Sequence, residues 1–466
     1  MEMINSRRGI LIVTILSSFS FPFMSSSVIV ALPSIGQEFA MGPTLLGWIS
    51  TSFLLAVAPL MIPFGRLSDI YGRKNIFVMG LLILFVASLF IALARSGEMI
   101  IACRVLQGIS SAMLNATVFP IMVAAVPLGQ RGHVLGLATA AVYFGLSAGP
   151  FLGGIITHYL GWRFIFWLNV PLSLALLMIT GVTVENDQRN VPGEKFDSVG
   201  AFLLASGLLA VMYGFSSLPS PTGFLLIGIG IFDIIGFVFF EMKASQPIVD
   251  INLFRHNAVF AFSNLAALIN YAATFAVTFL LSFYLQNIKA LTPQFAGLIL
   301  ITQPIVQAVF SPMIGRLSDR MEPRLLASSG MGLTLLGLIM LVFLDGQSAL
   351  LYILICLVVL GCGFALFSSP NTNAVMSSVD SQVYGVANAT LSTMRQMGMT
   401  FSMGIVMMCI SLFLGKAEIV AGNQGQFLNS MRISFVIFAL MCGGGIFASL
   451  ARGNINRAEQ PSANSL

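Results

Sequence analysis

The sequence predicts an all-α membrane protein of about fourteen transmembrane helices. Of its 466 residues, 57% are hydrophobic and only 8% are charged, against roughly 25% charged in soluble domains. The few charges are separated by long apolar stretches, and a five-residue element occurs twice in the chain. A soluble surface with so few charges would leave large apolar patches in contact with water. The composition therefore places the chain in a membrane.

The apolar stretches set the number of helices, because a helix needs about 20 apolar residues to cross a bilayer. Thirteen long stretches contain no Asp, Glu, Lys or Arg, and the one at 198–232 is divided by turn-forming residues at 217–222. The first stretch follows Arg7 and Arg8 but is too long for a signal peptide. The predicted helices lie at 9–33, 42–65, 75–94, 99–126, 133–156, 163–184, 197–217, 222–241, 258–285, 295–315, 324–344, 349–370, 385–415 and 430–451.

The basic residues predict the orientation of these helices, because cytoplasmic loops carry an excess of Lys and Arg. With the N-terminus inside, fifteen basic residues lie on the cytoplasmic side and five on the opposite side. An even number of helices then returns the C-terminus to the cytoplasm. The sequence thus predicts a multi-pass protein of the inner cell membrane with both termini cytoplasmic.

A repeated element predicts that the chain is built from two similar bundles. The sequence Gly65-Arg-Leu-Ser-Asp69 occurs again as Gly315-Arg-Leu-Ser-Asp319, each time at the cytoplasmic end of a predicted helix. Duplicated bundles are common in secondary transporters. The spacing of the copies leaves two helices between six-helix halves. The predicted domains are an N-terminal six-helix bundle at 1–184, two accessory helices with flanking loops at 185–256, and a C-terminal six-helix bundle with a short tail at 257–466.

Several spaced motifs resemble those of the major facilitator superfamily. The loop GRLSDIYGRK at 65–74 is similar to the family's loop motif G-x-L-x-D-x-x-G-R-[RK], and Arg104-Val-Leu-Gln107-Gly108 resembles the R-x-x-Q-G motif of its antiporters. Also typical of the fourteen-helix drug:proton antiporters of the EmrB/QacA type are Trp162-Arg163, Asn169-Val-Pro171 and Pro247-Ile-Val-Asp250. The resemblance spans nearly the whole chain and implies the major facilitator fold, with two six-helix bundles plus two extra helices.

The loop at 65–74 is a candidate gating element. Its glycines permit close backbone approach and a tight turn, and its aspartate can form charge-assisted hydrogen bonds that hold one conformation. The alternative is a basic loop that only fixes the orientation of the chain. The second copy is a weaker candidate, because Glu322 and Pro323 replace the second glycine and its arginine. The candidate gating residues are Gly65, Asp69, Gly72, Arg73 and Lys74, with Gly315 and Asp319 in the second copy.

A series of glycines marks the predicted helix at 133–156. The residues Gly136, Gly145, Gly149, Pro150, Gly153 and Gly154 are similar to the pattern G-x8-G-x3-G-P-x2-G-G of the antiporter branch. Glycines along one face allow another helix to approach closely, and proline permits a kink. The resemblance implies that this contact lies between the halves and favours export. The alternative is ordinary helix packing.

Three charged residues lie within predicted helices, namely Arg104, Arg395 and Asp233. Each costs roughly 2.5–3.5 kcal/mol to insert into a bilayer, so each should face protein or a water-filled cavity. We expect Arg104 and Arg395 in a central cavity, with an arginine bonded to carbonyls at helix ends as the alternative. Asp233 lies on a helix outside the twelve-helix core, where it is either a proton site or a packing residue.

The predicted cavity has basic side chains and no acidic ones. Met24 in the first helix occupies the position at which the antiporters that the chain resembles often carry an aspartate. A cavity with two arginines fits neutral or anionic amphiphiles better than cations, by charge complementarity. Together with Arg104 and Arg395, the candidate lining residues are Gln107, Asn270, Tyr271, Gln303, Gln307 and Met399, each of which could instead serve helix packing.

These observations favour a proton-coupled secondary transporter that exports amphipathic small molecules, such as drugs, toxins or metabolites, by alternating access. The alternative is a dedicated carrier of an organic anion or metabolite, which could also work in uptake. The sequence contains no HExxH, no Gly-x-Ser-x-Gly and no P-loop, so no enzymatic activity, metal or cofactor is expected. The expected partners are a small-molecule substrate, protons and membrane lipid, without nucleic acid, and the chain is expected to function as a monomer.

Overall fold

The computed structural model describes residues 2–127, 131–184, 196–244, 248, 251–318, 321–379, 384–415, 419 and 422–453. Within these residues the chain is helical and contains no strand. Fourteen of the described helical spans are long and apolar enough to cross a membrane, which confirms the prediction from the uncharged stretches. Asp319 of the second loop copy lies outside the described residues.

The helices fall into three consecutive groups along the chain. The first group is α1 (Glu2–Phe39), α2 (Pro43–Tyr71), α3 (Arg73–Ala92), α4 (Gly97–Ala124), α5 (Arg131–Tyr159) and α6 (Arg163–Thr183). The second is α7 (Ser198–Ser216), α8 (Pro221–Glu241) and the short α9 (Asn252–His256). The third is α10 (Ala258–Phe283) with its π-helical continuation η2 (Tyr284–Ile288), α11 (Pro293–Leu300), α12 (Thr302–Ser318), α13 (Pro323–Val342), α14 (Leu350–Ser377), α15 (Tyr384–Leu414) and α16 (Gln424–Ala451).

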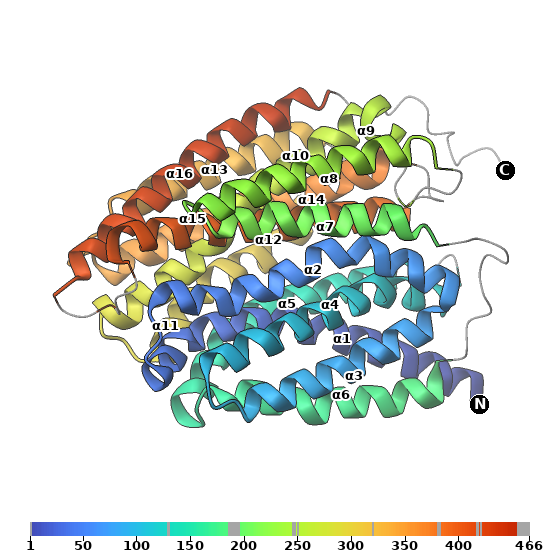
Figure 1. Ribbon diagram of the computed structural model, residues 1–466, viewed down its shortest axis with the longest axis horizontal. Helices are drawn as coiled ribbons and strands as arrows, with labels where there is room; N and C mark the ends of the chain where they lie inside the picture. The colour runs from blue at the N-terminus through green and yellow to red at the C-terminus, as the bar shows by residue number, and fades with distance from the viewer. Residues whose placement is uncertain are drawn as a thin grey trace.

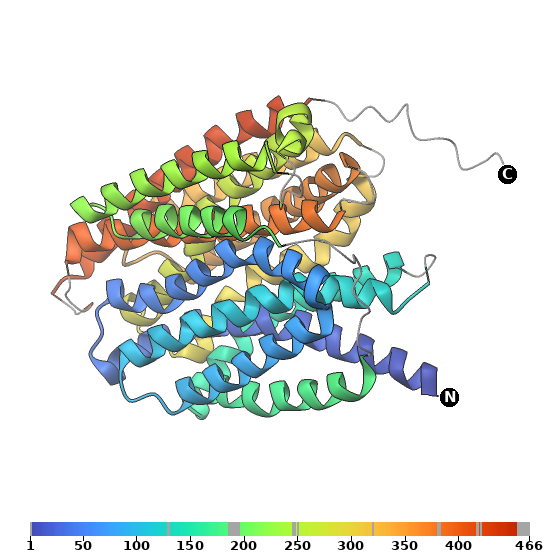
Figure 2. The same cartoon turned by 45° about the vertical axis from the view of Figure 1, so that its right-hand side comes forward.

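Two helical bundles lie side by side (Figures 1 and 2). Helices α1–α6 pack against one another as the N-terminal bundle, and α10–α16 pack against one another as the C-terminal bundle. Helices α7 and α8 pair with each other, and α7 also packs on α2 and α15. We call the end at which α1 begins and α16 ends the terminal end, and the opposite end, which holds the α1–α2 connection, the far end (Figure 1).

Local sequence signals set where several helices begin. Ser96 precedes α4 and accepts a hydrogen bond from the backbone N–H of Met99 at 3.3 Å. Asp197 precedes α7 and accepts one from the N–H of Gly200 at 2.8 Å. These side chains satisfy N–H groups that have no partner within a first helical turn. Pro43 opens α2 at a position that needs no N–H donor.

Some helix bounds differ from those predicted from the uncharged stretches. Helix α1 begins at Glu2 and includes Arg7 and Arg8, because a helix can continue past the apolar part of the bilayer. The span predicted at 295–315 consists of α11 and α12, with a turn between them at Ile301. Pro304 lacks the N–H that would bond the carbonyl of Leu300, so the regular helix is interrupted there.

The outer surface of the molecule carries many exposed apolar side chains. Val182 on α6, Phe232 on α8 and Phe447 on α16 are 88%, 75% and 76% exposed. Large exposed apolar surfaces are rare on soluble monomers. Here they lie on the helices that are long enough to cross a bilayer, so lipid is the environment that suits them.

Candidate functional site

The two bundles approach closely at the far end, where α5 meets α11. Gly154 of α5 faces the backbone carbonyl of Pro293, and Gly297 of α11 faces the backbone carbonyl of Pro150. A methyl group on either glycine would overlap the opposing backbone. The absence of side chains therefore permits this contact between the bundles.

The other glycines of α5 for which the structure gives contacts face α1, inside the N-terminal bundle. Gly145 faces the backbone of Phe19, and Gly149 and Gly153 face Ser26 and Ser27. The hydroxyl of Ser27 donates a hydrogen bond to the carbonyl of Gly149 at 3.0 Å. Gly136 lies nearer the start of α5. The glycine series thus combines packing inside one bundle with contact between the two.

Two further helix pairs join the bundles at the far end. On one side, the Thr51 hydroxyl of α2 lies 3.4 Å from the Met407 sulfur of α15. On the other, Ser282 and Gln286 of α10 and its continuation donate hydrogen bonds to α1, at 3.2 Å to the carbonyl of Ile29 and 3.0 Å to that of Val30. Each of these residues lies in the half of its helix nearer the far end. The far end is therefore closed in this conformation.

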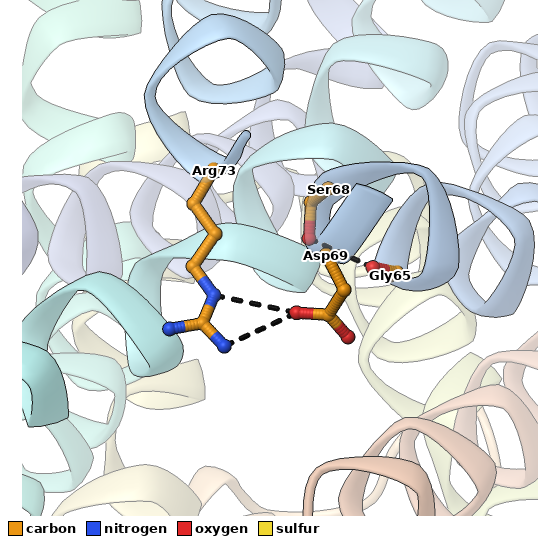
Figure 3. Close-up of polar contacts among 4 residues, drawn as sticks. All are labelled: Gly65, Ser68, Asp69 and Arg73. Carbon is orange, nitrogen blue, oxygen red and sulfur yellow. Dashed lines mark hydrogen bonds and ion pairs between the residues drawn. The ribbon is translucent and has the colours of Figure 1, made fainter. Parts of the chain in front are cut away.

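The loop at 65–74 lies at the terminal end and is held by its own residues (Figure 3). Asp69 Oδ1 accepts hydrogen bonds from Arg73 Nε at 3.3 Å and Nη2 at 3.1 Å, and the Ser68 hydroxyl donates to the Gly65 carbonyl at 2.8 Å. Gly72 separates α2 from α3 with φ +97°, a conformation that favours glycine. The Asp69 side chain is 38% exposed. Between described residues, the hydrogen bonds of Asp69 stay within its own bundle.

The remaining predicted loop residues lie near other helices of their own bundles. Lys74 Nζ donates to the carbonyl of Gly181 on α6 at 3.5 Å. Gly315 on α12 approaches the Ser369 hydroxyl on α14, which would lie 3.1 Å from an added Cβ. The structure therefore places the first loop copy and the described part of the second on separate bundles.

Arg104 is enclosed within the N-terminal bundle and does not reach the boundary with the other bundle. Its side chain is 1% exposed, and its Nε donates to the carbonyl of Ile49 at 3.0 Å while Nη1 donates to Gln107 Oε1 at 2.9 Å. The guanidinium lies 4.3 Å from the ring centre of Phe53. Gln107 Nε2 lies 3.5 Å from the sulfur of Met24. These contacts join α1, α2 and α4, so Arg104 and Gln107 form a packing network of this bundle.

Arg395 belongs to a polar cluster at the boundary between the bundles. We call this the boundary cluster and define it as Tyr143, Tyr271, Ser368, Thr372 and Arg395. The hydroxyls of Tyr143 on α5 and Ser368 on α14 lie 3.2 Å apart. Arg395 Nη2 donates to the Thr372 hydroxyl at 2.6 Å, and the guanidinium lies 5.7 Å from the ring centre of Tyr271 on α10. Both bundles therefore contribute to one polar site.

The boundary cluster lies on the terminal side of the closed contacts. Along the helix axes, Tyr143 lies about 10 Å before Pro150 on α5, and Arg395 about 18 Å before Met407 on α15. Hydrogen bonds between described residues that join the bundles lie at the level of Tyr143 or nearer the far end. The cluster thus lies directly inside the closed end, where a bound molecule would be cut off from the far side.

Arg395 carries a charge with little compensation from the protein. Between described residues, ion pairs join Asp69 with Arg73 and Glu38 with Arg163, and no described carboxylate lies within 4.0 Å of Arg395. Its Nε is enclosed without a hydrogen-bond acceptor. A positive charge inside a membrane span is costly unless it is paired or faces water. The site is therefore suited to accept negative charge.

The other predicted cavity residues are spread over the C-terminal bundle. The buried amide of Asn270 and the Nε2 of Gln307 have no hydrogen-bond partner among the described residues. The backbone carbonyl of Gln303 lies against Gly361 of α14. Met399 is half-buried on α15, one turn beyond Arg395. No direct bond between these four side chains and the boundary cluster is found in the described part of the chain.

Asp233 lies between the two accessory helices. Its Oδ2 accepts a hydrogen bond from the Ser206 hydroxyl of α7 at 2.9 Å, and its Cβ lies close to Gly207. Helix α7 stands between this carboxyl group and the two bundles. The structure therefore separates Asp233 from the boundary cluster.

The sequence reasoning did not identify Tyr143, Ser368 and Thr372. All three are uncharged and lie in long apolar stretches that otherwise indicated only helices. Tyr143 carries the one signal that was available, since it places a phenol hydroxyl near the middle of a predicted span, as Tyr271 does.

Among the described residues, no group of three or more His, Cys, Asp or Glu side chains could hold a metal ion.

Comparison with known proteins gives consistent similarities over most of the chain. Residues 14–403 and 263–462 match the sequence profile of the Major Facilitator Superfamily. The chain is 27% identical over 398 residues to the Riboflavin transporter RibZ of Clostridioides difficile strain 630, covering 85% of this chain and 86% of that protein. It is 29% identical over 402 residues to the Multidrug resistance protein Stp of Mycobacterium tuberculosis strain CDC 1551 / Oshkosh, covering 85% and 74%.

A solved structure shares the fold. It is that of a bacterial homolog of the human lysosomal transporter Spinster in an inward-facing and unoccupied conformation. The two structures superpose with a TM-score of 0.71 at 16% sequence identity, covering 96% of this chain and 97% of the other. At this identity the likeness concerns the arrangement of the helices alone.

Proposed function

The chain belongs to the major facilitator superfamily, and we propose that it is a proton-coupled exporter of small amphipathic molecules that works by alternating access. Its fold and family are those of membrane transporters and not of enzymes. The finer features of this proposal, which are direction, coupling ion and substrate type, rest on the arguments that follow.

The observation that carries the proposal is that the far end is closed, on the far side of the boundary cluster. Backbone contacts between α5 and α11, and side-chain contacts between α2 and α15, hold the bundles together there. The charged loop at 65–74 keeps its Asp69 bonded to Arg73 at the other end. Closure at one end beside a polar site shared by both bundles is what one state of an alternating-access carrier requires. The opposite state would open the α5–α11 contact.

The export direction is supported by topology and by likeness to relatives. The excess of basic residues predicts that the terminal end is cytoplasmic. The boundary cluster would then receive substrate from the cytoplasm in the conformation seen here. A multidrug resistance protein is among the relatives, and the glycines of α5 resemble the antiporter pattern. We propose that the chain functions in this way as a monomer in the inner cell membrane.

Proton coupling requires a group that binds and releases a proton within the membrane. Asp233 is the one carboxylate among the described residues that lies near the middle of a predicted span, and a carboxyl group can bind and release a proton. Its bond to Ser206 is compatible with either form. Asp233 therefore remains our candidate proton site, although α7 separates it from the boundary cluster.

A second candidate function is a dedicated carrier of an organic anion or metabolite, including one that works in uptake. The unpaired charge of Arg395 favours an anionic substrate, and one relative is named a riboflavin transporter. This alternative shares the fold and the site and differs in direction and coupling.

The two functions are separated by transport into everted membrane vesicles, whose cytoplasmic face is outside. An exporter driven by protons accumulates a fluorescent amphiphile when the vesicle interior is acidified, and a protonophore abolishes the accumulation. Asp233→Asn should remove the dependence on the pH gradient. Ser206→Ala, which keeps the carboxyl group and removes only its hydrogen-bond partner, is the packing control and should retain that dependence. Accumulation that survives the protonophore contradicts proton coupling, and transport only in right-side-out vesicles favours the uptake carrier.

A further inference from the structure

The boundary cluster combines a positive charge, an aromatic face and hydroxyl groups in one place. Resting on the proposed transport function, we infer that it binds a planar aromatic anion. The anionic group binds the guanidinium of Arg395, and the ring stacks against Tyr271. This names a substrate class more narrowly than amphipathic molecules in general.

The charge of Arg395 selects an anion. A guanidinium has five N–H donors, and the described residues supply one acceptor, the Thr372 hydroxyl at 2.6 Å. The half-buried side chain has no carboxylate partner among the described residues. A bound carboxylate would supply both the missing charge and the missing acceptors, whereas a cation would add like charge in a site of low dielectric.

The aromatic residues of the site select a flat ring. The Tyr271 ring lies 5.7 Å from the Arg395 guanidinium and packs edge-on against Phe364, with ring centres 5.2 Å apart. Because the Arg395 guanidinium lies over one face of the Tyr271 ring, the ligand ring would use the other side of Tyr271 for offset stacking. A saturated ring of equal size would lack that contribution, and we expect it to bind about two- to tenfold more weakly.

The N-terminal bundle also supplies a hydroxyl group to the site. Tyr143 is the residue of the N-terminal bundle in the cluster, and its hydroxyl lies 3.2 Å from that of Ser368. The ligand can carry a polar atom on the edge of its ring that is remote from its anionic group. This atom can replace Ser368 as the hydrogen-bond partner of Tyr143. A ligand bound in this way contacts both bundles, so its binding can bias their relative position.

The test is a binding measurement on the purified full-length chain in detergent, without any gradient. The probes are 2-naphthoate, its neutral analogue 2-naphthamide, the cation 2-naphthylmethylammonium and the saturated decalin-2-carboxylate. We expect 2-naphthoate to bind about ten- to a hundredfold more tightly than 2-naphthamide, the range of a charge-assisted hydrogen bond. Arg395→Gln should reduce this ratio to near one, and Arg395→Lys should retain part of it. Arg432→Gln on the exposed part of α16 is the matched control and should leave the ratio unchanged.

The result that would overturn the inference is equal or tighter binding of the cation, or a naphthoate preference that Arg395→Gln retains. Retained helix content and a single peak in gel filtration identify variants that are folded. If Arg395→Gln does not fold, Arg395→Lys provides the test instead. Because no gradient is present, this outcome is independent of direction and coupling. Naphthoate binding without proton-driven transport contradicts only the proposed exporter, and proton-driven export of cations without naphthoate binding contradicts only the aromatic anion.

Discussion

Replacing Gly297 with alanine should shift the molecule away from the conformation closed at the far end. The added Cβ would overlap the carbonyl oxygen of Pro150 and would lie 3.0 Å from its carbonyl carbon and 3.4 Å from the Cα of Gly154. Favourable carbon contacts lie at about 3.5–4.0 Å. Because the carbonyl oxygen of Pro150 is the atom that overlaps most, α5 and α11 must separate by roughly 1–1.5 Å. Overpacking of this size costs about 1–3 kcal/mol. The cost applies to the closed far end, because the α5–α11 contact exists there.

The assay measures how often the far end opens. Ser282 of α10 is fully buried at the closed far end, so Ser282→Cys, with the native cysteines replaced by alanine, reacts with a membrane-impermeant maleimide only when that end opens. A destabilisation of 1–3 kcal/mol raises the open-to-closed ratio about five- to 150-fold. We expect the labelling rate of Gly297→Ala to rise within that range.

The control is an alanine at a glycine that has space. Gly228 on α8 has no atom within 4 Å of an added Cβ, so Gly228→Ala should leave the labelling rate unchanged. An unchanged rate in Gly297→Ala, with protein still folded in the membrane, would refute the reasoning. It would show that the α5–α11 contact does not hold the far end closed.

Three further variants test other parts of the structure. Asp69→Asn should lower the transport rate without lowering the amount of protein in the membrane, because it removes the negative charge that pairs with Arg73 in the loop. Equal transport by wild type and variant would contradict a gating role. Arg104→Met leaves buried hydrogen-bonding groups unpaired at a cost of about 1–3 kcal/mol, so the midpoint of thermal unfolding in detergent should fall, whereas Val105→Met on the exposed face of the same helix should not change it. Tyr143→Phe should weaken binding of 6-hydroxy-2-naphthoate, which carries a hydroxyl group on the edge remote from its carboxylate, about two- to tenfold, while Tyr213→Phe on α7 should have no effect; equal losses would argue against a specific contact.

The sequence could predict the number and order of the spans because charge is costly inside a bilayer. Each uncharged stretch had to cross the membrane, and the two loop copies fixed which spans correspond. Local departures were harder to predict. The turn at Ile301 arises because Pro304 has no N–H to bond the carbonyl of Leu300. The start of α1 lies in a charged segment, where hydropathy does not indicate the end of a helix.

The site could be predicted only in part, since depth along a helix can be read from the sequence but the direction of a side chain cannot. Arg104 and Arg395 both lie inside spans, yet Arg104 bonds the Ile49 carbonyl within one bundle and Arg395 lies at the boundary between two. Tyr143 and Ser368 lie 225 residues apart in the chain. No local pattern relates them, because their contact depends on how the bundles pack.

The accessory helices make the two flanks of the molecule unequal toward the lipid. On one flank, α7 packs on both bundles, with the rings of Tyr213 and Trp48 5.4 Å apart on the side of α2 and those of Phe215 and Phe401 4.9 Å apart on the side of α15. The opposite flank, where α5 meets α11 and α12, has no such cover among the described helices. A hydrophobic molecule dissolved in the bilayer would thus find the seam between the bundles shielded by α7 on one side, and its sideways entry would have to run along α5.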